Sequence, residues 1–381
     1  MRGWTVAGEF CVRARRVARA CLWLAAASLL AVLLGGCQSV GYYFQAIHGQ
    51  AQILHREHAI ATLLKSDTTP EPLKAKLRTV LEMRGFAEQN LRLPADGHYL
   101  AYADLGRTYA VWTVYAAPEF SLTPKSWWYP VVGRLNYRGY FSEKKAREFA
   151  DKLKRRGFDV YVGGVTAYST LGWFHDPVLN TFINYDNADL AELLFHELAH
   201  QRLFIAGDTE FNEAFATTVA EEGVRRWLRA RGSEADVVEY ELDVRRHELV
   251  YELIARARAE LEALYDDLPE EPPRDLDECR RRKHEIVLRL RRDYLGLRRG
   301  WGAHFDFDRW FSQDLNHAQL NTIDTYHHLV PAFRRQLQSQ HGDLEAFFKL
   351  ARGLERLDKA ARRAKLEALG TTSASDQGPV Q

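Results

Sequence analysis

The feature that most constrains this chain is the stretch from Asp189 to Arg231, a pair of predicted helices that carries an H-E-x-x-H motif. His196 and His200 are four residues apart on the first helix, so their side chains leave one face of it a turn apart. Two imidazoles in that arrangement can reach one Zn²⁺ at about 2 Å from each nitrogen. Glu197 points beside the metal position, where a general base takes a proton from water. The motif therefore predicts a helix that holds a catalytic metal.

Local signals predict where these two helices begin and end. Asp189, with Glu192 three residues later, forms a pair that resembles a capping box and marks a helix start. Gly207 can end the first helix with a positive φ, and Asp208 or Thr209 can cap the second. Leucines recur at helical spacing after the start signal, which predicts that the first helix is buried.

The second helix supplies the remaining groups of the predicted site. The turn between the helices folds Glu213 back toward His196 and His200. Two histidines and one glutamate leave a fourth position for water, which is typical of a catalytic rather than a structural zinc site. We therefore expect one Zn²⁺ with these three ligands. Asn212, beside Glu213, and Thr217, one turn later, are candidates for hydrogen bonds that hold the ligands in place.

An H-E-x-x-H sequence also arises by chance, because surface helices are rich in Glu and His. Three features favour the metal site: the apolar residues directly before His196, the helix breaker at Gly207, and the N-E-x-x-A sequence that starts at Asn212. A polar surface helix has no need of Leu193 and Leu194 before the histidine.

The first 36 residues are expected to be a lipoprotein signal peptide. Arginines precede an apolar run from Ala20 to Leu34, and the L-G-G-C sequence that ends at Cys37 resembles a lipobox. The run is shorter than the about 20 residues that a spanning helix needs. Lipidation of Cys37, with palmitate among its chains, would anchor the protein in the bacterial cell envelope. Gln38 is typical of lipoproteins sent to an outer membrane, facing the periplasm. An uncleaved N-terminal anchor is the alternative, and it places the domain on the same side.

Composition excludes some classes of function. The chain has 381 residues, 46% hydrophobic and 27% charged, which is typical of one large or two moderate globular domains. Its net charge of +1 argues against a nucleic-acid partner, because phosphate binding requires a concentrated excess of Lys and Arg. After processing and lipidation, Cys279 would be the one thiol left, so no intramolecular disulfide is expected.

Hydrophobic periodicity predicts an α+β fold that is predominantly helical. Apolar residues recur at helical spacing from Tyr42 to Leu64 and from Pro72 to Asn90, which indicates two helices. Tyr109 to Ala117 and Asp159 to Gly163 have the composition of strands, and a helix capped by Ser142 lies between them. We expect these strands to form a small mixed sheet packed on the pair of site helices.

The rest of the chain is predicted to be helical up to a short tail. A charged, heptad-like pattern over about residues 236–298, interrupted near 266–273, predicts an antiparallel helical hairpin. The hairpin belongs to a domain that spans residues 37–370. Residues 371–381 are small and polar, and we expect them to be disordered.

Further motifs lie around the site helices: Y-R-G-Y-F from Tyr137, G-V-T-A-Y-S-T-L-G-W-F from Gly164, and D-P-V-L from Asp176. Together with the H-E-x-x-H motif they resemble a family of predicted aminopeptidases found as bacterial lipoproteins. The resemblance runs, in weaker form, from the lipobox to about residue 350.

This resemblance implies a zinc-dependent peptidase of the gluzincin kind, with a thermolysin-like pair of active-site helices. The two histidines and Glu213 are then the zinc ligands, and Glu197 is the general base. One departure concerns His175, which stands where an acidic residue is expected beside Asp176. If that pair recognises the amine of a peptide substrate, with Asp176 as the candidate, its charge is reduced in this chain.

A peptidase also needs a donor that stabilises the oxyanion of its transition state, and a tyrosine hydroxyl is a common one. Tyr326 and Tyr168 are the candidates. Two other functions are compatible with the sequence. One is an envelope endopeptidase or processing protease with the same zinc chemistry. The other is a non-catalytic scaffold lipoprotein with a vestigial zinc site, against which the retention of Glu197 argues.

Overall fold

The computed structural model describes residues 42, 45–129, 133–167, 175–266, 276–302, 305–327 and 329–371. The chain divides into two units, Met1–Ile53 and Leu54–Gln381. In the first unit, residue 42 and residues 45–53 are helical. The signal peptide, Cys37, Tyr168 and residues 372–381 of the predicted tail lie outside the described residues.

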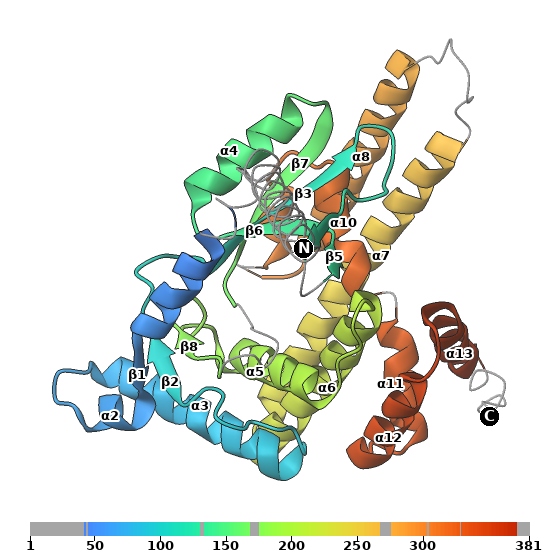
Figure 1. The fold of residues 1–381 in the computed structure, drawn as a ribbon. Coiled ribbons are helices and arrows are strands. Elements are labelled where there is room, and N and C mark those ends of the chain that lie inside the picture. The colour runs from blue at the N-terminus through green and yellow to red at the C-terminus, as the bar shows by residue number, and fades with distance from the viewer. Residues whose placement is uncertain are drawn as a thin grey trace, which may run out of the picture. The chain divides into compact units, whose positions relative to one another are not determined.

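The second unit is predominantly helical with small sheets, which confirms the predicted α+β class (Figure 1). Its helices are α2 (Ile60–Lys65), α3 (Glu71–Asn90), α4 (Glu143–Lys154), α5 (Asn187–Arg202), α6 (Thr209–Ala230), α7 (Glu234–Asp266), α8 (Leu276–Arg298), α9 (Phe307–Phe311), α10 (His317–His327), α11 (Val330–Ser339), α12 (Leu344–Leu354) and α13 (Lys359–Thr371). Its strands are β1 (Glu57–Ala59), β2 (Ala101–Ala103), β3 (Val111–Pro118), β4 (Trp127–Tyr129), β5 (Gly133–Leu135), β6 (Tyr137–Tyr140), β7 (Phe158–Val165) and β8 (Val178–Leu179). No described helix has both the length and the apolar character needed to cross a membrane.

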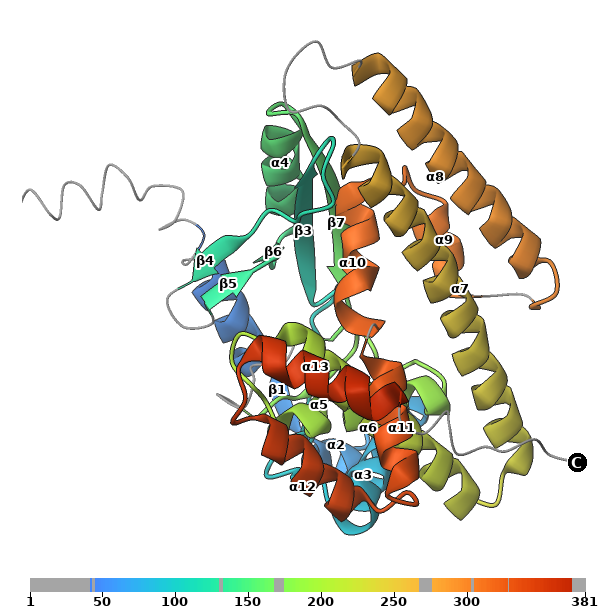
Figure 2. The ribbon, with the colours of Figure 1, turned by 90° about the vertical axis from the view of Figure 1, so that its right-hand side faces the viewer.

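Two three-stranded sheets and a hairpin of β4 and β5 form among the described residues. The predicted strands are β3 and β7, and the predicted helix between them is α4, whose N-cap Ser142 accepts a hydrogen bond from the Lys145 amide. Both β6 and β7 pair with β3 in antiparallel fashion, so this sheet is not mixed. Parallel pairing occurs in the other sheet, where β2 pairs with β8 and, antiparallel, with β1. Figure 2 shows α4 on one side of the β6-β3-β7 sheet and α10 on the other.

The first predicted helix is interrupted in the structure. Instead of one helix from Tyr42 to Leu64, β1 separates a helical stretch from α2, because His58 and its neighbours pair with β2. The second predicted helix is confirmed as α3. A long-range strand partner, which periodicity along the chain does not reveal, thus overrides the local preference for a helix.

Helices α7 and α8 pack against each other and run in opposite directions, as a helical hairpin does (Figures 1 and 2). Their facing sides join α9 and α10 in one apolar cluster, which includes Leu261 and Leu290. Within it, the rings of Tyr294 and Phe311 stack with centroids 3.8 Å apart. Most of the charged residues of α7 and α8 therefore lie on the outside of the hairpin. Its apolar inner side packs against α10, which lies beside the sheet.

A buried polar cluster joins this hairpin to β3, β7 and α10. The His317 ring is fully buried; its Nδ1 lies 3.1 Å from the Pro118 carbonyl oxygen, and its Nε2 lies 2.7 Å from the Tyr265 hydroxyl. Neutral imidazole satisfies both contacts, donating from Nδ1 and accepting at Nε2. The Asp159 carboxylate, close to the same ring, accepts a hydrogen bond from Lys283 at 2.7 Å. Burial and the charge of Lys283 lower the pKa of His317 to about 4.

We expect the stability of the protein to fall in acid because of His317. Its pKa is about 4 in the folded state against 6.5 unfolded, so the unfolded chain binds the proton more readily as the pH falls from about 6.5 to about 4. The free energy of unfolding should decrease by about 3 kcal/mol across that window. His317→Asn keeps a donor for the Pro118 carbonyl and removes the titration. Urea unfolding at pH 7 and pH 4.5 should show a smaller decrease in the variant; equal decreases would contradict this assignment.

Candidate metal centre

The site lies on α5 and α6, whose ends are set by local hydrogen bonds. The N-cap of α5 is Asp186, whose carboxylate accepts from the Asp189 amide at 2.9 Å, so the predicted start at Asp189 is wrong by three residues. Asp186 takes this role because its backbone is extended (φ −61°, ψ 172°) while Asp189 is already helical. Glu192 does not complete a capping box, because its carboxylate accepts from the Tyr240 hydroxyl at 2.8 Å.

The turn between the helices differs from the prediction in one respect. Helix α5 ends at Arg202 rather than at Gly207, which instead supplies a positive φ of +82° within the turn. Asp208 caps α6 as predicted, accepting from the Phe211 amide. The side chain of Asn212 accepts from the Ile205 amide and donates to the Ile205 carbonyl, both at 2.8 Å. Its place beside Glu213 suggested that Asn212 holds a metal ligand. In the structure Asn212 instead holds the turn.

Packing on the far side of α6 makes its position rigid. Phe211 and Phe215 are fully buried and face α11 and α12. The Phe211 and Phe333 ring centroids are 5.1 Å apart, and Phe215 stacks on Phe347 at 5.7 Å. Burying aromatic rings in such edge-to-face and stacked pairs is a large source of packing energy. Apolar contacts therefore contribute to the position of the helix that carries Glu213, independently of any metal.

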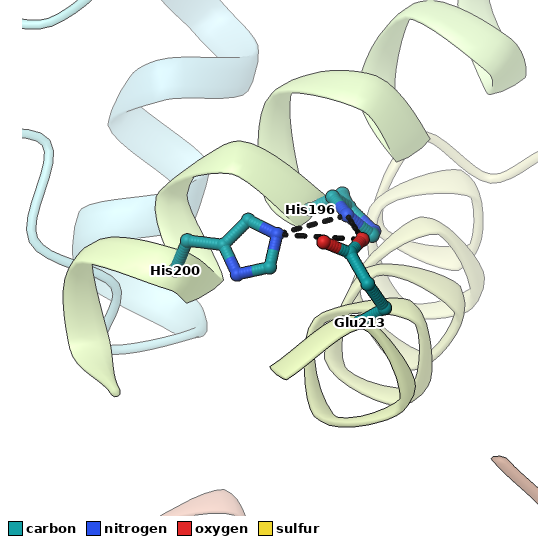
Figure 3. Close-up of side chains that lie close together, drawn as sticks. All are labelled: His196, His200 and Glu213. Carbon is teal, nitrogen blue, oxygen red and sulfur yellow. Dashed lines mark hydrogen bonds and ion pairs between the residues drawn. The ribbon is translucent and has the colours of Figure 1, made fainter. Parts of the chain in front are cut away.

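Three predicted ligands meet between the two helices (Figure 3). The Nε2 atoms of His196 and His200 are 3.1 Å apart. The Glu213 Oε2 atom lies 3.1 Å from the first of them and 3.7 Å from the second. The His200 side chain is 6% exposed, and the other two are about one-fifth exposed. The structure therefore brings together the three side chains that the sequence assigned to one metal.

The dimensions of this triangle fit zinc. Ligand bonds of about 2.0–2.1 Å at tetrahedral angles place neighbouring donor atoms about 3.3 Å apart. The three observed separations, 3.1, 3.1 and 3.7 Å, lie on both sides of that value. Nitrogen and carboxylate oxygen donors also suit Zn²⁺ chemically. The buried Nδ1 of His200 has no hydrogen-bond partner among the described residues, so its ring is oriented by packing, for example against Phe204.

Charges at the site favour an ionised Glu213. Burial acts to raise the pKa of this carboxyl, but hydrogen bonds from His196 and His200 outweigh burial and hold it well below its usual range. For His196, burial acts to lower the pKa and the hydrogen bond and charge of Glu213 raise it. A carboxylate must be deprotonated to bind a metal, and Glu213 meets that condition.

Glu197 is half-buried beside the ligands. Burial raises the pKa of its carboxyl, and the charges of His196 and His200 oppose that effect. The charge of Asp176 also acts to raise the pKa of this carboxyl. Asp176 is buried, and its Oδ2 lies 3.6 Å from the His98 Nδ1. The predicted amine-binding residue therefore interacts electrostatically with the predicted base, and its closest described partner is His98.

The other predicted site residues are less closely associated with the ligands. Thr217 lines the same pocket as His196, and it makes no hydrogen bond to either histidine in the described part of the chain. The backbone of Tyr326 is in α10. Tyr168 belongs to the segment outside the described residues. The described residues therefore do not identify either tyrosine as the donor that stabilises the oxyanion.

Sequence reasoning missed Tyr115, whose hydroxyl is influenced by the site. Burial raises the pKa of Tyr115, and the charge of Glu213 contributes to the increase. The residue lies on β3 directly opposite Tyr137 and Tyr161 on the neighbouring strands, so three tyrosines share one face of the sheet. The alternation of side chains along β3 could have indicated which face of the sheet Tyr115 occupies. It could not have indicated that this residue is influenced by Glu213.

A pocket of about 1280 Å³ extends from His196 along α5. Asp189, Glu192 and His196 follow one another at helical spacing on the wall of this pocket. Glu221 and Glu248 also line it and are paired with Arg334, whereas Asp189 and Glu192 have no cationic partner among the described residues. Burial raises the pKa of Asp189 to about 7 and also raises the pKa of Glu192, so both carboxyls become protonated more readily than exposed ones.

Comparison with known protein families found one match. Residues 41–366 match the family described as "Putative aminopeptidase". The chain belongs to this aminopeptidase family. The match covers most of the chain and includes the ligand triangle, Glu197 and the pocket. A search of curated proteins and a search of solved structures found no match. Membership points to peptide hydrolysis, and a peptide is the substrate expected of this family.

Proposed function

We propose that this aminopeptidase-family protein is a zinc-dependent aminopeptidase. The observation that carries the proposal is the triangle of His196, His200 and Glu213 donor atoms, of zinc-sized dimensions, beside the half-buried Glu197. Zn²⁺ bound by these residues supplies a Lewis acid that polarises a carbonyl and acidifies water. Glu197 takes a proton from the attacking water and gives it to the leaving amine.

Recognition of a free N-terminus requires a negative group near the reacting bond. The pocket beside His196 supplies it through Glu192 and Asp189, which lie one and two turns before the histidine and have no cationic partner within the described residues. Asp176 is the candidate named from the sequence; it is buried near His98 and is not among the described residues that line the pocket. Glu192 is the nearer of the two carboxyls to His196 along α5, and an incoming ammonium group would lower its raised pKa by pairing with it, so Glu192 is our candidate for binding the substrate amine.

Glu192→Gln is therefore expected to lower kcat/KM for peptides with a free N-terminus by about 10–100-fold, since one hydrogen bond to a charged group contributes about 1.5–3 kcal/mol. Glutamine keeps the size of the side chain and can still accept from the Tyr240 hydroxyl. N-acetylated peptides, which lack the amine, should be cleaved slowly and at the same rate by both proteins. Assays of matched free and acetylated peptides decide the point, with Asp176→Asn as the comparison variant. An equal decrease for both substrates would exclude Glu192 from amine binding.

The same assay addresses the alternative of an envelope endopeptidase. If the wild-type protein cleaves acetylated and free peptides equally well, an amine-binding carboxylate plays no part in cleavage, and that result would favour the endopeptidase.

We further propose that lipidation of Cys37 anchors the protein in the bacterial envelope, facing the periplasm. The support for this is the L-G-G-C sequence and the apolar run before it.

A further inference from the structure

The C-terminal helix α13 contacts the turn between the two site helices through a buried ion pair. The Arg362 Nε donates to the Asp208 Oδ2 at 2.9 Å. Both residues are buried, with 5% and 4% of their surface exposed. Lys359 adds a second positive charge 3.8 Å from the other Asp208 oxygen. Burying two charges costs several kcal/mol per ion, so this pair is a costly way to attach one helix.

Asp208 also determines where α6 begins. Its Oδ1 accepts from the Phe211 amide in the first turn, while its Oδ2 accepts from Arg362. The guanidinium of Arg362 lies over the Phe211 ring at 5.4 Å from the centroid. Arg362 thus fixes the rotamer of the cap and the start of the helix, and Glu213 follows five residues after the cap.

A second bridge holds the other end of the turn. Arg202, the last residue of α5, pairs with Glu345 in α12 at 3.2 Å, and His200 lies two residues before it. Within the turn, Asn212 binds both backbone groups of Ile205. The C-terminal helices therefore contact the turn on the His200 side and on the Glu213 side.

We propose that Arg362 is a positioning residue, which acts through Asp208 to hold Glu213 at the distance from His196 and His200 that the metal requires. This inference rests on the proposed zinc site. Arg362 itself touches neither the ligands nor the pocket among the described residues, so its effect should appear in metal affinity. A purely structural ion pair would alter the stability of the protein and leave the zinc affinity unchanged.

The test is a zinc titration of metal-free full-length protein with a competing chelator. Arg362→Met should raise the Kd for zinc by about 10–100-fold, the usual effect of removing a group that orients a ligand. Arg362→Lys keeps the charge and should recover part of the affinity. The matched control is Lys283→Met, which breaks the half-buried pair with Asp159 in the hairpin cluster. The control should lose stability with no change in the Kd for zinc.

Breaking one side of a buried pair can prevent folding. Asp208→Asn, combined with Arg362→Met, removes both charges and keeps an N-cap acceptor, so it should fold and still bind zinc more weakly than wild type. If every folded Arg362 variant binds zinc as tightly as wild type, the positioning role is wrong while the zinc site stands. Wild-type protein that does not bind zinc at all would overturn the proposed site and, with it, the role of Arg362.

Discussion

Glu197→Gln is expected to lower kcat for peptide hydrolysis by about 10²–10⁴-fold, which is the usual contribution of a general base. Glutamine has the size of glutamate, so α5 should keep its packing, and the three ligands are unchanged. The amide cannot accept the proton from water or return it to the leaving amine. Zinc content should therefore stay at about one ion per chain while activity falls close to background.

Two measurements make this result decisive. Metal analysis of the purified variant checks that zinc is retained, and steady-state assays with the same aminoacyl substrates give kcat. Glu222→Gln is a matched control, because Glu222 lies on α6 and pairs with Arg226 at 2.8 Å, away from the ligand triangle. Wild-type activity in Glu197→Gln would mean that the site does not hydrolyse peptides by this mechanism. A zinc-loaded wild type without peptidase activity would favour the non-catalytic scaffold.

His200→Ala is expected to abolish zinc binding at micromolar concentrations. Removal of a group that merely orients a ligand costs about 10–100-fold in affinity, and removal of a ligand itself should cost more. Only His196 and Glu213 would remain, and zinc sites in proteins use at least three protein ligands. Glu213→Gln should have a smaller effect in the same direction, because a neutral amide is a poorer ligand than a carboxylate.

The measurement is zinc per chain after dialysis against a weak chelator. His58→Ala serves as the control, because His58 is exposed on β1 and is not among the three ligands. Undiminished zinc in His200→Ala would refute the assigned ligands. Loss of zinc from both variants would instead indicate binding to surface histidines.

Features of the site that depend on neighbouring residues along the chain could be predicted from the sequence. The spacing of His196 and His200 fixes their common face, and Asp208 caps α6 as expected. The placement of Glu213 near the histidines could also be predicted, because the turn between the helices folds the second helix back toward the first. The helix start at Asp186 was missed because Asp186, Asn187 and Asp189 can each cap a helix, and the backbone φ and ψ decide among them.

Features that depend on distant residues could not be predicted. Periodicity gives β3 and β7 but not their antiparallel pairing, nor the strand β1 inside an apparently helical stretch. Tyr115 and Glu213 belong to different elements, and nothing in either segment refers to the other. Asn212 was expected to hold the ligands in place because it stands beside Glu213, whereas its side-chain amide bonds both backbone groups of Ile205 and closes the turn.

The pairing of Asp208 with Arg362 has a consequence for the order in which the protein matures. The two residues are 154 positions apart, and the histidines precede both. At a synthesis rate of roughly 5–20 residues per second, Arg362 is made about 8–30 s after Asp208. A nascent chain thus carries the complete H-E-x-x-H motif well before Arg362, which we propose to position Glu213, has been made. If Arg362 positions Glu213 as proposed, a chain that lacks α13 binds zinc more weakly, and the full metal affinity is reached only after α13 has docked.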